Sequence, residues 1–140
     1  MADPINTPTG AAQSIAVSAL RAQQARMRII AENLANSDST SRTPGGDPYR
    51  RQEPIFEPSK VSGGMGVRMS RAAPDPTAFK STYAPGNPSA DAQGYMKTPN
   101  VDPMIEAMDM REAQRAYEAN LNVIETARSM DQRTLDLLKR

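Results

Sequence analysis

The sequence contains no cysteine, no histidine and no tryptophan, and its aromatic residues are limited to four tyrosines and two phenylalanines in 140 residues. Without cysteine there is neither a disulfide framework nor a thiol nucleophile. Without histidine, the side chain most often used as a general base is missing. The scarcity of large aromatic side chains argues against a large globular core.

Common enzyme motifs are also absent. There is no glycine-rich dinucleotide-binding motif, no phosphate-binding loop and no serine in a nucleophile-elbow context. We therefore expect no catalytic activity and no cofactor. The formal net charge is +1 and no basic patch dominates, so nucleic acid is not an expected partner. No apolar run is long enough to span a membrane, and no Sec-type signal pattern opens the sequence, so membrane insertion is not expected either.

The longest regular pattern covers residues 102–140. This stretch contains no glycine. Its only proline is Pro103, which would be the first helical residue and which follows a potential capping residue, Asp102. Apolar side chains recur at steps of three and four residues, with charged residues between them. The pattern predicts one long helix with an apolar stripe, and we expect four residues in or beside the stripe at an assembly interface: Tyr117, Asn120, Ile124 and Leu138.

A second amphipathic helix is predicted over residues 11–36, and a row of alanines beside its apolar stripe permits close approach of another helix. Residues 1–10 contain two prolines and a glycine, and we expect a flexible leader there. Asn36 is expected to end the helix, because asparagine tolerates the left-handed conformation found beyond a helix C-terminus. The residues of this segment expected at the assembly interface are Ile15, Leu20, Met27, Ile30, Asn33, Leu34 and Asn36.

Residues 37–101 have a different composition, since nine of the twelve prolines and seven of the eight glycines fall there. Residues 49–56 and 66–69 have strand character and are joined by a turn region at a Gly-Gly pair. Residues 83–100 are predicted to form an ordered loop. The expected hydrophobic anchors of this insert are Tyr49, Ile55 and Phe56, packed against Val61 or Val67.

The predicted fold is therefore mainly α. The helices of residues 11–36 and 102–140 pair as a coiled coil, and residues 37–101 form an irregular or β insert between them. The N-terminal helix has few large apolar side chains, and their burial does not offset the conformational entropy lost on ordering the helix. We therefore expect the helices to become stable when other chains cover more than one of their faces.

Polar residues in these helices admit more than one interpretation. Asn33 and Asn120 could fix the register between packed helices, as a buried asparagine does in coiled coils. For Asn33, a solvent-facing position near the helix end is the alternative. Asp102, Glu106 and Asp109 fall on one helical face and could hold a hard cation. Acidic residues are also favoured in the first turns by the helix dipole, and we expect no metal site.

Five short motifs carry a family resemblance. Residues 18–27 read SALRAQQARM and residues 33–36 read NLAN, and together they resemble the N-terminal signature of bacterial flagellar rod and hook proteins. Residues 83–95 read YAPGNPSADAQGY and residues 99–102 read PNVD, which resembles the proximal-rod members of that group in particular. Residues 117–120 read YEAN and are similar to the C-terminal signature of the same family.

The resemblance implies a structural subunit of the flagellar basal-body rod. Such a protein is exported by the flagellar type III apparatus without a cleaved signal peptide and is assembled in the periplasmic space. The implied partners are other flagellar rod proteins, copies of the chain itself and the export apparatus. The resemblance also implies that the paired terminal helices form an inner domain lining the rod channel, with the insert outside.

Two other functions are compatible with the residues. The chain could be a soluble helical adaptor or export-chaperone-like binding module, which would be well folded alone and would stay in the cytosol. Binding to a membrane surface is a weaker possibility, because neither helix has a lysine-rich polar face.

Overall fold

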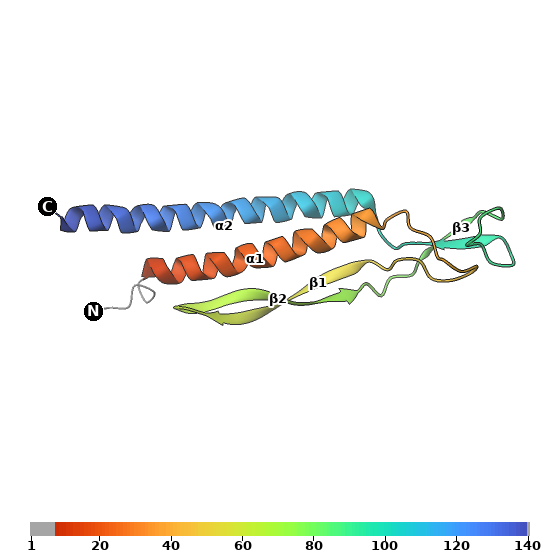
Figure 1. Ribbon diagram of the computed structural model, residues 1–140, viewed down its shortest axis with the longest axis horizontal. Helices are drawn as coiled ribbons and strands as arrows, with labels where there is room; N and C mark the ends of the chain where they lie inside the picture. The colour runs from red at the N-terminus through yellow and green to blue at the C-terminus, as the bar shows by residue number, and fades with distance from the viewer. Residues whose placement is uncertain (1–7, 140) are drawn as a thin grey trace. The chain divides into compact units, whose positions relative to one another are not determined.

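The computed structural model describes residues 8–139. Two helices, α1 (Pro8–Ala35) and α2 (Pro103–Leu138), flank four strands in the sequence. The strands are β1 (Gln52–Val61), β2 (Gly64–Pro74), β3 (Lys80–Tyr83) and β4 (Tyr95–Thr98), and Figure 1 shows the elements. β1 pairs with β2 and β3 pairs with β4, so the insert contains two separate two-stranded sheets. The mainly α-helical class and the order of helix, insert and longer helix agree with the prediction.

The described chain divides into two compact units. Unit 1 comprises residues 8–27, 55–71 and 111–139, and unit 2 comprises residues 28–54 and 72–110. Each helix and each of the two long strands therefore begins in one unit and ends in the other.

The helix ends follow the sequence closely, with two corrections. α1 begins at Pro8, so the last three residues of the predicted leader are helical, and the rest of that leader lies outside the described residues. α1 ends at Ala35, but no described residue other than glycine has a positive φ, so the left-handed ending predicted at Asn36 is wrong. Instead, both the backbone N and the side-chain Nδ2 of Asn36 donate to the carbonyl of Glu32, at 3.1 and 2.8 Å.

The start of α2 confirms the predicted cap. Pro103 is its first residue, where a missing N–H breaks no helical hydrogen bond. Oδ1 of Asp102 accepts from the backbone N of Met104 at 2.9 Å and of Ile105 at 3.4 Å. The aspartate thus satisfies two of the backbone donors that a helix N-terminus leaves unpaired.

In unit 1, the segments of α1 and α2 lie side by side (Figure 1). The side chain of Gln13 donates to Asp131 at 3.2 Å, and that of Gln24 donates to Tyr117 at 3.5 Å. The buried apolar residues of unit 1 within the described chain are all alanines: Ala16, Ala22, Ala113 and Ala127. Small side chains let two helix backbones approach closely, but each buries little apolar area.

The hairpin of β1 and β2 reaches α1 through its glycines. Only Ser62 and Gly63 separate the strands, which requires an antiparallel pair, and Gly63 has a φ of 81°. A Cβ at Gly63 would lie 2.5 Å from the Cβ of Ala11, and a Cβ at Gly66 would lie 2.2 Å from Oγ of Ser18. The absence of side chains at both positions therefore permits this contact with α1.

The two long strands differ from their prediction. They span ten and eleven residues, whereas the pattern predicted strands over residues 49–56 and 66–69. Phe56 is exposed, so its predicted role as an anchor of the insert is wrong. Most positions of both strands are partly or fully exposed, which removes the strict alternation of buried and exposed residues from which strand ends are usually recognised.

Unit 2 contains the second sheet and three large buried apolar side chains, Ile29, Ile30 and Val101. β3 and β4 are antiparallel, with Lys80 opposite Thr98 and Tyr83 opposite Tyr95. The prediction of a loop over residues 83–100 is wrong for Tyr83, the last residue of β3, and for residues 95–98, which form β4. Each of these strands has only four residues, too few for a periodic pattern to be visible.

Candidate functional site

The structure separates the predicted interface residues into three groups. Ile15, Leu34 and Leu138 are exposed. Leu20, Met27, Asn36, Tyr117, Asn120 and Ile124 are partly buried. Ile30 and Asn33 are 3% and 1% exposed within the single chain. The assignment of the last two to an interface with other chains is therefore corrected, because the chain itself already covers both side chains.

Unit 1 leaves most of its large apolar side chains in contact with solvent. The exposed ones on its helices are Ile15, Val17, Leu121, Val123, Met130, Leu135, Leu137 and Leu138. A soluble monomer rarely leaves so many apolar side chains uncovered on two neighbouring helices. This distribution is typical of a surface that another chain covers.

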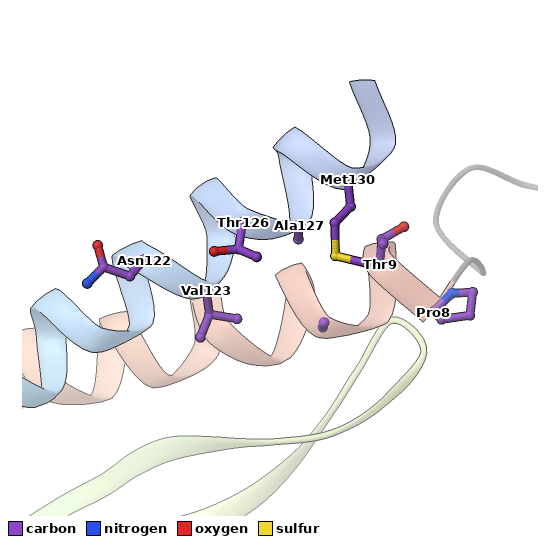
Figure 2. A pocket seen from close by; sticks show the side chains of 8 residues that line it. Pro8, Thr9, Asn122, Val123, Thr126, Ala127 and Met130 are labelled. Carbon is purple, nitrogen blue, oxygen red and sulfur yellow. The ribbon is translucent and has the colours of Figure 1, made fainter. Parts of the chain in front are cut away.

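An apolar groove of about 440 Å3 lies in unit 1 between the start of α1 and the second half of α2. Figure 2 shows Pro8 and Thr9 from α1 on one side and Val123, Thr126 and Met130 from α2 on the other. The remaining lining residues are Ala12, Asn122 and Ala127. No residue of the lining is charged, so the groove suits an apolar side chain or helix edge from another chain.

Asn120 makes a hydrogen bond within its own helix, and the register role expected for it stays a prediction. Its Nδ2 donates to the carbonyl of Ala116 at 2.7 Å, within the same helix. This bond satisfies the amide nitrogen locally and does not join Asn120 to α1.

The most buried polar residues of the described chain lie in unit 2. Asn33, near the end of α1, and Glu106, near the start of α2, are 1% and 0% exposed. Nδ2 of Asn33 donates to Oε2 of Glu106 at 3.3 Å, and the hydroxyl of Tyr49 donates to Oδ1 of Asn33 at 2.8 Å. The solvent-facing alternative considered for Asn33 is therefore wrong.

Arg51, immediately before β1, neutralises part of the charge around Glu106. Its Nε donates to Oε1 of Glu106 at 2.5 Å, and its Nη1 lies 2.8 Å from Glu53 and 3.2 Å from Asp75. Its Nη2 lies 3.7 Å from Oδ2 of Asp109. One guanidinium thus faces four carboxylates that come from four separate positions of the chain.

These surroundings raise the pKa values of Arg51 and Tyr49. Burial alone lowers the pKa of Arg51, but the hydrogen bonds to Glu106 and Asp75 and the negative charges of Glu106 and Glu53 outweigh burial and raise the pKa above its usual value. The pKa of Tyr49 is raised, first by burial and then by the charges of Glu32 and Glu106. At neutral pH Arg51 is therefore a charged donor, and Tyr49 carries the hydroxyl proton that it donates to Asn33.

The arrangement does not correspond to the hard-cation site considered for α2. Asp102 caps the helix, and Glu106 is bonded to Asn33 and Arg51. Within residues 8–139, no group of three or more acidic, histidine or cysteine side chains is placed to hold a metal ion. The helix-dipole interpretation explains Asp102 but did not predict the buried ion pair of Glu106.

Sequence analysis missed the two residues from outside the helices that complete the network. Tyr49 was expected only as a hydrophobic anchor, and Arg51 was not singled out. An arginine beside a strand is usually solvated, and no local pattern indicates a partner 55 positions away. The available signal was Asn33 itself, since a buried asparagine requires polar partners.

Comparison with known proteins identifies the family. A family model described as "Flagella basal body rod protein" matches residues 14–42, and one described as "Flagellar basal body rod FlgEFG protein C-terminal" matches residues 92–137. The flagellar basal-body rod protein FlgC of Agrobacterium fabrum is 48% identical over 134 residues, covering 94% of this chain and 96% of its own length. The chain belongs to the FlgC family. FlgC of Escherichia coli is 44% identical, covering 88% of this chain and 92% of its own length, and FlgC of Bacillus subtilis is 34% identical, covering 90% and 95%.

FlgC-family membership decides the class of function. The chain is a structural subunit of the flagellar basal-body rod, which confirms the resemblance. The structural role of its FlgC relatives agrees with the expectation that the chain is not an enzyme. Neither described helix of this FlgC-family chain is both long and apolar enough to cross a lipid bilayer.

The FlgC-family chain is expected to lose stability in acid through Asp75. Oδ1 of Asp75 accepts from the backbone N of Thr77 at 2.8 Å, and this bond, together with Arg51, lowers the pKa of Asp75 below 3.8 even though burial opposes the shift. A lowered pKa stabilises the fold above the usual aspartate value, and this contribution is lost as the pH falls through the folded-state pKa.

We therefore expect the free energy of unfolding of unit 2 to fall below about pH 4, by at most about 1.4 kcal/mol per pH unit for one proton. Urea titrations at several pH values measure this slope. Asp75→Asn should flatten it, whereas Asp38→Asn, at an exposed residue of the same unit, should leave it unchanged. Equal slopes for the wild type and Asp75→Asn would contradict the assignment.

Proposed function

We propose that the chain polymerises with copies of itself and with related rod proteins through its terminal helices, paired as a coiled coil. The observation that carries the proposal is the distribution of apolar residues in unit 1. Its buried apolar residues within the described chain are alanines, whereas its large apolar residues lie on the surface of α1 and α2. Such helices gain most of their stabilisation when other chains cover them.

The groove between α1 and α2 gives this surface a specific shape. Val123 and Met130 are exposed beside it, and the other lining side chains are small or uncharged. An apolar helix edge of a neighbouring subunit would remove both residues from water without burying a charge. The insert would then make lateral contacts outside the paired helices.

We extend the proposal to delivery of the subunit. Export by the flagellar type III apparatus and assembly in the periplasmic space are supported by the family of the chain and by its sequence motifs. The stretches of the chain that bury few large side chains should unfold readily, which suits passage through an export channel.

A soluble adaptor that binds other proteins without polymerising is the alternative. The exposed apolar face of unit 1 would serve such a module as well, so the two functions differ in the state of the isolated chain. An adaptor should be folded at any concentration, whereas a rod subunit should gain structure on association.

The test is a dilution series of the purified chain, from micromolar to nanomolar, monitored by far-ultraviolet circular dichroism and by sedimentation. We expect helicity to fall on dilution together with the sedimentation coefficient, because the helices of unit 1 need partners. A monomer that melts cooperatively at nanomolar concentration, with amide protons protected along both helices, would favour the adaptor and overturn polymerisation through the helices.

A further inference from the structure

Every hydrogen-bonding position of the Asn33 side chain is occupied. Oδ1 accepts from the hydroxyl of Tyr49 at 2.8 Å and from the backbone N of Gln52 at 2.9 Å. Nδ2 donates to the backbone O of Gln52 at 2.9 Å and to Oε2 of Glu106 at 3.3 Å. An amide has two acceptor positions and two donor protons, so these four contacts fix its orientation. At 1% exposure, water does not compete for them.

The same contacts select one alignment of the two helix ends. A slip of α1 by one turn in its own N-to-C direction would place Ile29 or Ile30 where Asn33 lies, and Oε2 of Glu106 would lose its donor. An unpaired acceptor in a buried site is strongly unfavourable. Elsewhere the side chains of α1 discriminate little between one register and the next. Alanines recur at one-turn spacing, at Ala12, Ala16 and Ala19, so a slip by one turn places one alanine where another was.

The pair also joins the two parts of the chain that the family models match. Asn33 lies in the matched segment 14–42 and Glu106 in the matched segment 92–137. Tyr49 and Arg51 come from the stretch between these segments. The end of α1 and the start of α2, which both lie in segments that the family models match, are therefore contacted by residues of the insert.

We propose that Asn33 and Glu106 form a polar lock that sets the register of residues 28–35 against residues 103–110, with Tyr49 and Arg51 as its positioning residues. The lock makes the end of α1 select the start of α2 from its own chain. The consequence in assembly rests on the proposed function: where many similar helices are present, the lock disfavours pairing of α1 with an apolar stripe of a neighbour, because such pairing leaves Glu106 without a donor.

Each element packed around the Asn33 side chain contributes a charged group. Glu32 comes from α1, and Arg51 and Glu53 come from the start of the hairpin. The remaining ones are Asp75 after β2, and Glu106 and Asp109 from α2. A carboxylate in place of the Asn33 amide would therefore meet Glu106 directly, and the guanidinium of Arg51 is already paired with Glu106.

The first experiment exchanges the amide and the carboxylate. Asn33→Asp alone should reduce the folding equilibrium constant of unit 2 roughly ten- to a hundredfold, because Glu106 loses a donor and gains a like charge. Adding Glu106→Gln restores one amide opposite one carboxylate, so the double variant should be more stable than the sum of the single effects predicts. Urea titrations followed by tyrosine fluorescence measure all three variants. Gln93→Glu makes the same chemical change at an exposed site and should have almost no effect.

A pH profile distinguishes the lock from general packing. The single variant Asn33→Asp should regain stability as the pH is lowered, since a proton taken up between the two facing carboxylates restores a donor. Additive single effects together with a flat profile would overturn the lock. These results would not bear on the proposed polymerisation, which the dilution series tests separately.

If Asn33→Asp does not fold, the wild-type chain supplies the measurement. The side-chain amide protons of Asn33 should exchange with solvent far more slowly than those of Gln93 in nuclear magnetic resonance spectra, because Gln93 is exposed. Equal exchange rates would show that water reaches the Asn33 amide and would overturn the proposal.

Discussion

Replacing Arg51 with methionine is expected to lower the free energy of unfolding of unit 2 by about 3–5 kcal/mol. The side chain of Arg51 is 19% exposed and its partner Glu106 is 1% exposed. Without the guanidinium, Glu106 keeps a buried charge whose remaining polar partner is the amide of Asn33. The nearby carboxylates of Asp75 and Glu53 then repel it without compensation.

Tyrosine fluorescence in a urea titration measures this effect, because the chain has no tryptophan and Tyr49, Tyr83 and Tyr95 all lie in unit 2. The matched control is Lys97→Met, which breaks the exposed ion pair with Asp47 at 2.6 Å in the same unit and should change the free energy of unfolding far less. Equal losses from the two substitutions would mean that the carboxylates around Arg51 are solvated, contrary to their burial in the structure.

The two long helices were predictable because their determinants are local. The apolar period, the Asp102 cap and Pro103 are all readable within one segment of the chain, and the structure places α2 at Pro103–Leu138. In the alanine row predicted beside the stripe of α1, Ala22 is buried, and close approach of another helix to this row stays a prediction. The position at which α1 ends was predicted, but the reason was not. Asn36 forms hydrogen bonds to Glu32 and does not adopt the left-handed conformation that was expected.

The buried network was not predictable because its members are far apart in sequence. Tyr49 is 16 residues from Asn33, and Glu106 is 73 residues from it. Hydrophobic periodicity places Ile30 and Asn33 on the same helix but does not say which element covers them. Both are buried within the single chain, and the partners of Asn33 come from the chain's own insert and from α2.

The two units have opposite compositions of buried residues. Unit 2 buries Ile29, Ile30 and Val101 together with the polar pair Asn33 and Glu106. Unit 1 buries alanines among its described apolar residues and exposes its larger side chains. Under the proposed function, stability within one chain and recognition between chains therefore depend on different residues, and we expect that mutation can disrupt the two properties separately.

Replacing Met130 with glutamate is expected to abolish swimming and incorporation into the rod while the chain is still made and exported. Met130 lies at the edge of the groove, between Ala127 of α2 and Thr9 of α1 (Figure 2). A carboxylate covered there by an apolar neighbour would have no partner, and a penalty of about 4 kcal/mol lowers an association constant roughly a thousandfold. Soft-agar motility of a complemented deletion strain and the protein content of purified basal bodies measure the effect.

The control, Ser129→Glu, adds the same charge one residue away, at an exposed position that does not line the groove, and should leave motility intact. If Met130→Glu swims and enters the rod normally, the groove is not covered in the assembly; if both variants fail equally, charge on α2 is the cause.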